Sequence, residues 1–172
     1  VAVLSEVLEA FGGAGYVEDT GLPVLLRDAQ VLPIWEGTTN VLALDVLRAL
    51  EDTGGLKPLH RAFGTWLREV PEALAPLAHE ARAALQAADA WLAETVDDPV
   101  RLQADARRFA LTLGRAAALA LLVRQAAWSQ TRGDKRLAAA AHRFARHSVN
   151  LLPTGTPPAE SRMLALDEPS KS

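Results

Sequence analysis

Six apolar residues between positions 74 and 92 recur at alternating spacings of four and three. They are Leu74, Ala78, Ala81, Leu85, Ala88 and Leu92. An α-helix has 3.6 residues per turn, so this spacing aligns all six side chains on one face and is typical of a helix packed against other helices. The chain is 49% apolar but only 5% aromatic, so Ala and Leu, both strong helix formers, must supply most of the core. The sequence predicts an all-α fold, an up-down bundle of antiparallel helices.

Glycine and proline mark where these helices stop. We expect a first helix up to about Phe11, ended by Gly12-Gly13, and an irregular connection over residues 14–21. A short helix over residues 22–30 follows, and Pro33 then starts a loop. Thr38 or Thr39 caps the next helix, which is apolar nearly all round and is therefore expected to be buried up to about Leu50.

A long helix is predicted to begin at Asp98-Pro99 and to end before Gly133. Its expected buried stripe consists of Leu102, Phe109, Leu113, Ala117, Ala120 and Trp128. Asp134 is expected to cap a final helix that ends near Leu152. With a turn at residues 52–55, the chain divides into three predicted parts, residues 1–52, residues 53–152 and a mostly disordered tail over residues 153–172.

Composition excludes several kinds of protein. Cysteine is absent, which excludes disulfides and thiolate metal sites. The four histidines have no metal-ligand spacing, so no metal site is predicted. We find neither a signal peptide nor an apolar run long enough to span a bilayer, and we therefore expect a cytoplasmic protein without a membrane partner.

Charge is distributed unevenly along the chain. Residues 1–98 carry a net charge of −10, whereas residues 99–150 carry +8. The basic residues of the second half include Arg107, Arg108, Arg143 and Arg146. Such a run is either a solvated or docking face of the fold, or a surface that binds nucleic acid weakly and without sequence preference. The sequence leaves both alternatives open.

Two motifs lie about twenty residues apart in the first part. The first is Phe11-Gly12-Gly13-Ala14-Gly15-Tyr16, and the second is Ile34-Trp35-Glu36-Gly37-Thr38-Thr39-Asn40. Together, and with Arg27-Asp28-Ala29 between them, they resemble the last part of an acyl-CoA dehydrogenase. The resemblance runs almost continuously from Leu8 to Leu50.

The resemblance implies α,β-dehydrogenation of an acyl-CoA thioester, with Glu36 as the base that removes the α-proton. A carboxylate in that role needs an apolar pocket that raises its pKa, and Ile34 and Trp35 are expected to form its walls. Gly37 is implied to approach the substrate thioester. Without the resemblance, a carboxylate just before a helix would simply stabilise the helix dipole.

The resemblance also implies FAD as the cofactor. Thr38 and Asn40 match positions that contact the flavin diphosphate at a helix N-terminus. A further segment, Glu9, Ala10, Phe11, Gly12 and Gly13, matches one that touches the adenosine end of a flavin bound to a neighbouring subunit. Glu9 and Asn40 depart from the family pattern, which has glutamine at both positions.

The length of chain after the second motif is similar to the AidB branch of the family, whose extra C-terminal helices bind DNA. The chain starts in helical rhythm without a cap, and we expect it to be cut from a longer protein that also holds the flavin-binding parts. On its own it is expected to be inactive, to retain no FAD and to form homo-oligomers. The alternative is a DNA- or protein-binding helical module without dehydrogenase activity.

Overall fold

The computed structural model describes residues 1–153, and every regular element in that range is a helix. The predicted all-α fold is thus confirmed. The chain divides into two compact units, an N-terminal unit (Val1–Asp45) and a C-terminal unit (Val46–Ser172). The predicted disordered tail from residue 154 onward lies outside the described residues.

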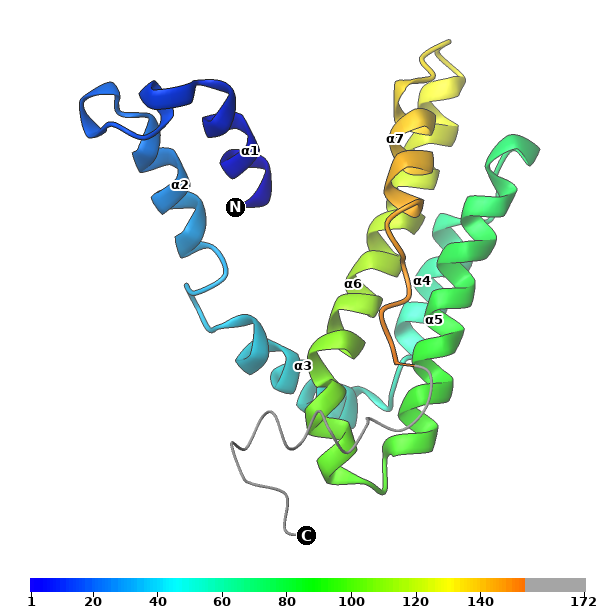
Figure 1. Ribbon diagram of the computed structural model, residues 1–172. Coiled ribbons are helices and arrows are strands. Elements are labelled where there is room, and N and C mark those ends of the chain that lie inside the picture. Colours follow the sequence, from blue (N-terminus) through cyan, green and yellow to red (C-terminus); the bar gives the residue numbers. More distant parts are fainter. Residues whose placement is uncertain (154–172) are drawn as a thin grey trace, which may run out of the picture. The chain divides into compact units, whose positions relative to one another are not determined.

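The N-terminal unit consists of two short α-helices joined by two 3-10 turns. Their bounds are α1 (Ala2–Ala10), η1 (Gly12–Gly15), η2 (Glu18–Thr20) and α2 (Leu22–Val31). α1 and α2 pack side by side (Figure 1). Gly15 makes this packing possible, because a Cβ on it would lie 2.2 Å from the carbonyl oxygen of Leu8. Only a glycine lets the turn approach α1 so closely.

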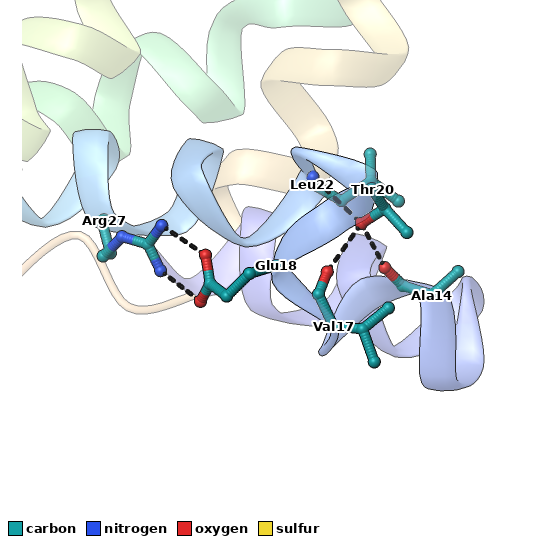
Figure 2. A network of polar contacts seen from close by, with 6 residues as sticks. All are labelled: Ala14, Val17, Glu18, Thr20, Leu22 and Arg27. Atoms are coloured by element: carbon teal, nitrogen blue, oxygen red, sulfur yellow. Dashed lines mark hydrogen bonds and ion pairs between the residues drawn. The ribbon is translucent and has the colours of Figure 1, made fainter.

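A small polar network fixes the connection between the turns and α2. The Thr20 hydroxyl lies 2.7 Å from the carbonyl oxygen of Ala14 and 2.9 Å from that of Val17, and it accepts from the Leu22 N–H (Figure 2). Arg27 on α2 reaches back to Glu18 with two hydrogen bonds of 2.8 Å. The connection expected to be irregular is therefore a defined pair of turns.

Helix α3 (Thr39–Thr53) contributes its first half to the N-terminal unit and its second half to the C-terminal unit. The remaining elements are α4 (Lys57–Trp66), η3 (Glu72–Leu74), α5 (Ala75–Thr95), α6 (Pro99–Gln130) and α7 (Arg136–Ala145). α5 and α6 form an antiparallel pair, and α4 and α7 both pack on α6 (Figure 1).

The core of the C-terminal unit lies between α5 and α6. Leu85, Phe109, Leu119 and Val123 are almost completely buried, and the Trp91 ring stacks on the Phe109 ring with 4.9 Å between centroids. Five of the six residues in the 74–92 series are buried, and the sixth, Leu92, packs against the core. The spacing of four and three thus identified the packed face correctly.

Helix α6 begins where the sequence predicts, because the Asp98 side chain accepts from the Arg101 N–H at 3.0 Å. By length and composition alone α6 is apolar enough to cross a membrane, contrary to the prediction that no apolar run of the chain is long enough to span a bilayer. About 44% of that apolar stretch is buried inside the unit, and the core helices of bundles meet the same criteria of length and composition.

The final helix is shorter than predicted. α7 ends at Ala145 and not near Leu152. Arg115 on α6 donates to the carbonyl oxygens of Ser148 and His147, and the Thr112 hydroxyl accepts from the Leu151 N–H. These bonds from α6 replace the helical bonds of residues 146–152, and the buried Val149 anchors the segment.

Two predictions of burial are wrong. Trp128 was expected on the buried stripe of α6 but is 52% exposed. At 3.6 residues per turn it lies about 100° around the helix from Phe109, beyond the covered face. The predicted burial of α3 also fails in its N-terminal half, where Ala43 is buried but Val41 and Leu42 are exposed, because no apolar surface of the N-terminal unit covers them.

Candidate active site

The turn between α2 and α3 carries the residue predicted to be the base. The N–H groups of Ile34 and Trp35 both donate to the carbonyl oxygen of Val31, and the Gly37 N–H donates to that of Ile34. Glu36 stands between them with a φ of 61°, in the left-handed region. A residue with a Cβ is held there at an energetic cost, and such residues concentrate at functional sites.

The Glu36 side chain is exposed and has no hydrogen-bond or ion-pair partner within residues 1–153. It therefore does not cap α3, whose first turn contains no acidic residue. Ile34 and Trp35 are 62% and 66% exposed, so they do not enclose the carboxylate. The apolar pocket expected around Glu36 is not formed by the described residues.

The residues after Glu36 lead directly into α3. Gly37 has a φ of 128°, and a Cβ there would lie 3.2 Å from the Leu42 side chain, so glycine is favoured at this position. The Leu42 N–H donates the first helical hydrogen bond of α3 to the carbonyl oxygen of Thr38. Thr38 and Asn40 are both exposed. The N-terminus of α3 thus presents an exposed hydroxyl and an exposed amide side chain beside helical N–H groups.

The second predicted segment closes α1. Glu9 and Ala10 end the helix, Phe11 follows, and Gly12 and Gly13 open the 3-10 turn, all of them exposed. Glu9 and Gly12 line a hollow of about 260 Å³ together with Leu8, Tyr16 and Leu26, among others. The hollow is smaller than a typical ligand site of roughly 300–1,000 Å³.

The four arginines predicted to contact nucleic acid are all exposed. Arg107 and Arg108 lie on α6, Arg143 lies on α7, and Arg146 follows it. Several basic residues of the second half are engaged within the unit. Arg101 pairs with Glu94, Arg136 pairs with Asp134, and Arg115 binds backbone carbonyls and lies over the Phe144 ring. The basic half is therefore partly a structural and partly a solvated surface, and nucleic-acid binding stays a prediction.

Two family models together match most of the chain. The model described as acyl-CoA dehydrogenase, C-terminal domain, matches residues 1–51. The model described as acyl-CoA dehydrogenase 11 C-terminal domain-like matches residues 65–161, more than half of the chain. The chain belongs to the acyl-CoA dehydrogenase family. It corresponds to the C-terminal portion of such a protein.

Known relatives agree with this assignment. Acyl-CoA dehydrogenase family member 11 of Caenorhabditis elegans is 42% identical over 134 residues, which cover 72% of this chain and 21% of that protein. 3-Methylmercaptopropionyl-CoA dehydrogenase of Ruegeria pomeroyi is 34% identical over 130 residues, 68% of this chain and 22% of that protein. The putative acyl-CoA dehydrogenase AidB of Escherichia coli is 45% identical over 56 residues, 33% of this chain and 10% of that protein.

The chain matches about a fifth or less of the length of these curated relatives. No solved structure matches it significantly. The family portion therefore holds the turn with Glu36, while between about four fifths and nine tenths of each relative lies outside the match.

The structure of this acyl-CoA dehydrogenase portion reveals features that the motifs did not indicate. The packing of the backbone requires a glycine at position 15, but not at positions 12 or 13. In the sequence, Gly15 was marked only by its place before Tyr16 in the first motif. Trp128 was predicted to lie on the buried stripe of α6, and no role was predicted for Arg124 beside it. Within residues 1–153, no three His, Asp or Glu side chains gather where they could hold a metal ion.

Proposed function

We propose that this chain is the C-terminal part of a FAD-dependent acyl-CoA dehydrogenase in which Glu36 removes the α-proton of the acyl-CoA thioester. The observation that carries the proposal is the conformation of Glu36, which combines a φ of 61° with a side chain that is bonded to nothing within residues 1–153. A residue held in this strained form without a structural bond is typical of a functional role. The family match over residues 1–51 includes this turn.

Proton abstraction requires that Glu36 lose its water. Desolvation raises the pKa of a carboxylate toward the range of a useful base, and Ile34 and Trp35 offer apolar surface for this purpose. Because both are more than half exposed in the chain alone, the remaining cover must come from the acyl chain and from parts of the protein outside this portion. Gly37, without a side chain, leaves room for the thioester beside its backbone.

The residues at the N-terminus of α3 fit the diphosphate of a dinucleotide. Exposed Thr38 and Asn40 side chains stand beside the N–H groups of the first helical turn, where an anion is favoured. Along Glu9 to Gly13 the exposed backbone next to Gly12 suits an adenosine, and the Glu9 carboxylate can accept hydrogen bonds from ribose hydroxyls but repels phosphate. When bound, FAD supplies the acceptor for the hydride that leaves the β-carbon.

The decisive test uses a full-length protein that contains this portion. Glu36→Gln should keep stoichiometric flavin, because the amide is nearly isosteric, and lower turnover at least about a hundredfold, since the amide cannot take the proton. Glu6→Gln on α1 is the matched control and should leave turnover unchanged. Equal turnover for Glu36→Gln and the control would show that the base lies on another element.

The chain alone should retain no flavin and oxidise no acyl-CoA, since it covers about a fifth of the length of its relatives. The purified chain is therefore expected to be colourless. Absorbance near ~450 nm with one FAD per chain would contradict this, because tight retention of a cofactor needs a largely enclosed site.

A further inference from the structure

One exposed aromatic side chain of the C-terminal unit stands between two hollows. Trp128 lies near the end of α6 and is 52% exposed. It lines a hollow of about 590 Å³ with Leu121, Leu122 and Arg124, and a second of about 490 Å³ whose lining includes Trp66, Arg68, Glu69 and again Arg124. Both volumes fall within the usual range of small-molecule sites, roughly 300–1,000 Å³.

Positive charge surrounds this ring. The Arg132 guanidinium lies over the Trp128 ring, 3.7 Å from its centroid, while Arg68 and Arg124 line the hollows. Within residues 1–153, no carboxylate pairs with any of these three arginines. They differ in this from Arg101 and Arg136, which have acidic partners on the same unit. The second hollow contains one carboxylate, that of Glu69.

These groups match the parts of a nucleotide. Any planar base can stack on an indole ring, whichever hydrogen-bond donors and acceptors lie on its edges. The position of Arg132 shows that one face of the Trp128 ring already packs against a flat cationic group. Arginines that lack carboxylate partners bind phosphate oxygens in a fixed, two-pronged geometry. A carboxylate such as Glu69 repels phosphate but accepts hydrogen bonds from ribose hydroxyls or from an exocyclic amine.

We propose that the surface formed by Trp66, Arg68, Glu69, Arg124, Trp128 and Arg132 binds a nucleoside phosphate. The base stacks on Trp128, the phosphates bind Arg124 and Arg68, and the apolar hollow along Leu121 and Leu122 takes any apolar substituent of the ligand. The site lies within the C-terminal unit and does not involve Glu36. It is therefore independent of the proposed dehydrogenase function, and its test measures binding and not turnover.

Other occupants use these groups less completely. An apolar helix would cover Leu121 and Trp128 but leave three arginines without counter-charges. Duplex DNA would satisfy the arginines through its backbone without stacking on the indole ring, because its bases are already stacked on one another. The combination of ring and arginines favours a free, planar and anionic ligand, or an unpaired nucleotide of a single strand.

Titration calorimetry on the whole chain at low salt tests the proposal with AMP, ATP and coenzyme A as probes. We expect saturable binding of one nucleotide per chain, with ATP tighter than AMP because it offers more phosphate oxygens. Inorganic phosphate, which has no ring to stack, should bind far more weakly. Absence of saturable nucleotide binding at millimolar concentration would overturn the proposal.

Matched variants assign the binding to this surface. Trp128→Ala should weaken binding about tenfold or more, the scale of one lost base–aromatic stack, whereas Trp128→Phe should retain most of it. Arg124→Gln should weaken binding as well, while Lys57→Gln removes the same charge from an exposed position on α4 and should have no effect. Circular dichroism checks that each variant stays helical. If Trp128→Ala unfolds, the separate variants Trp128→Phe and Arg124→Gln show whether the nucleotide binds at this surface.

Two results would contradict the proposal even if nucleotides bind. If Lys57→Gln weakens binding as much as Arg124→Gln does, the attraction is a general effect of positive charge on the unit. If duplex DNA binds more tightly than ATP and Trp128→Phe and Trp128→Ala bind it equally, the surface recognises a phosphate backbone and not a base. A single-stranded oligonucleotide that competes with ATP and depends on Trp128 would identify a strand as the source of the nucleotide.

Discussion

The two units of the chain differ in whether their apolar side chains are buried or exposed. Fourteen of the nineteen large apolar residues that are exposed among residues 1–153 belong to the N-terminal unit. Of the twenty-three buried apolar residues in the same range, only Ala29 and Ala43 belong to it. The C-terminal unit covers its own apolar surface, whereas the N-terminal unit presents its surface outward.

The unit with the larger core is therefore not the unit that carries the candidate active site. The C-terminal unit has a core of its own around α5 and α6 and needs no partner to bury it. The N-terminal unit carries the Glu36 turn, and its exposed apolar surface is of the kind that marks interaction sites. We infer that the candidate site belongs to the unit that depends on cover from elsewhere, which is where a site completed by other parts of a protein is expected.

Self-association provides the largest test of this comparison. In a monomer Val3 and Val7 on α1 would stay 75% and 45% exposed, so we expect a dimer or tetramer at micromolar concentration, an association free energy of roughly 8 kcal/mol. Sedimentation equilibrium measures the mass. Val3→Glu with Val7→Glu should shift it toward the monomer, while Val100→Glu on α6, also at an exposed position, should not.

A clean monomer of the unaltered chain across the micromolar range would show that the exposed surface of the N-terminal unit does not drive association. If Val100→Glu dissociates the oligomer as well, the interface includes the C-terminal unit and the contrast between the units is weaker than proposed.

The difference in apolar burial between the two units can also be tested by the loss of folding stability when one phenylalanine in each unit is replaced. Phe109→Ala in the C-terminal unit should lower the free energy of unfolding by about 3–5 kcal/mol, because the ring is fully buried and stacked on Trp91. Phe11→Ala in the N-terminal unit should change it by no more than about 0.5 kcal/mol, since Phe11 is 53% exposed. Urea denaturation followed by circular dichroism gives both values in the same assay. Similar losses for the two variants would mean that Phe11 is covered in solution.

The sequence predicted the C-terminal unit better than the N-terminal one, and the reason is physical. The spacing from Leu74 to Leu92 identified the buried face of α5 because a helix whose partners lie in the same chain shows its packing in its own pattern. The apolar residues of α3 gave the same signal, but Val41 and Leu42 are exposed because the pattern does not say whether the cover lies in the same chain.

Tertiary contacts explain the other differences. The end of α7 could not be predicted from residues 145–152, because Arg115 and Thr112, more than thirty residues upstream, bind the backbone there. In the candidate site the motif predicted the loop, Glu36 and the start of α3. The strained φ of Glu36 and the close approach of Gly15 to Leu8 depend on backbone geometry that no residue pattern encodes.

Gly15 tests how the N-terminal unit holds together without a large core. A Cβ at this position would lie 2.2 Å from the Leu8 carbonyl oxygen, which is backbone and cannot turn away, so Gly15→Ala should destabilise the packing of α1 on α2 by about 1–3 kcal/mol. Hydrogen exchange should rise in α1 and α2 and stay unchanged in α5 and α6. Gly13→Ala is the control, because nothing lies within 4 Å of its Cβ position. Exchange that increases in both units would show that they unfold together.

The smallest expected effect concerns two exposed ion pairs, one in each unit. Arg136 holds the pKa of Asp134 down, from its ordinary value of 3.8 to about 2, mainly through side-chain hydrogen bonds of 2.7 and 3.1 Å. A carboxylate with a depressed pKa stabilises the fold fully above pH 3.8 and loses this contribution as the pH falls through about 2. Both partners are solvent-accessible, so the contribution to stability is small. In the N-terminal unit, Arg27 lowers the pKa of Glu18 in the same way.

Carbon-13 NMR titration of the carboxyl groups resolves both pairs in one experiment. Arg136→Gln should raise the pKa of Asp134 toward 3.8 but not fully, because the backbone N–H of residue 136 still donates to the carboxylate at 2.9 Å. Arg27→Gln should raise the pKa of Glu18 and leave that of Asp134 unchanged. Because each ion pair is local, we expect the pKa of its carboxylate to rise in the same way in both units. The units would then differ in how far their apolar side chains are buried and not in their ion pairs. An Asp134 titration that Arg136→Gln does not move would show that the pair does not form in solution.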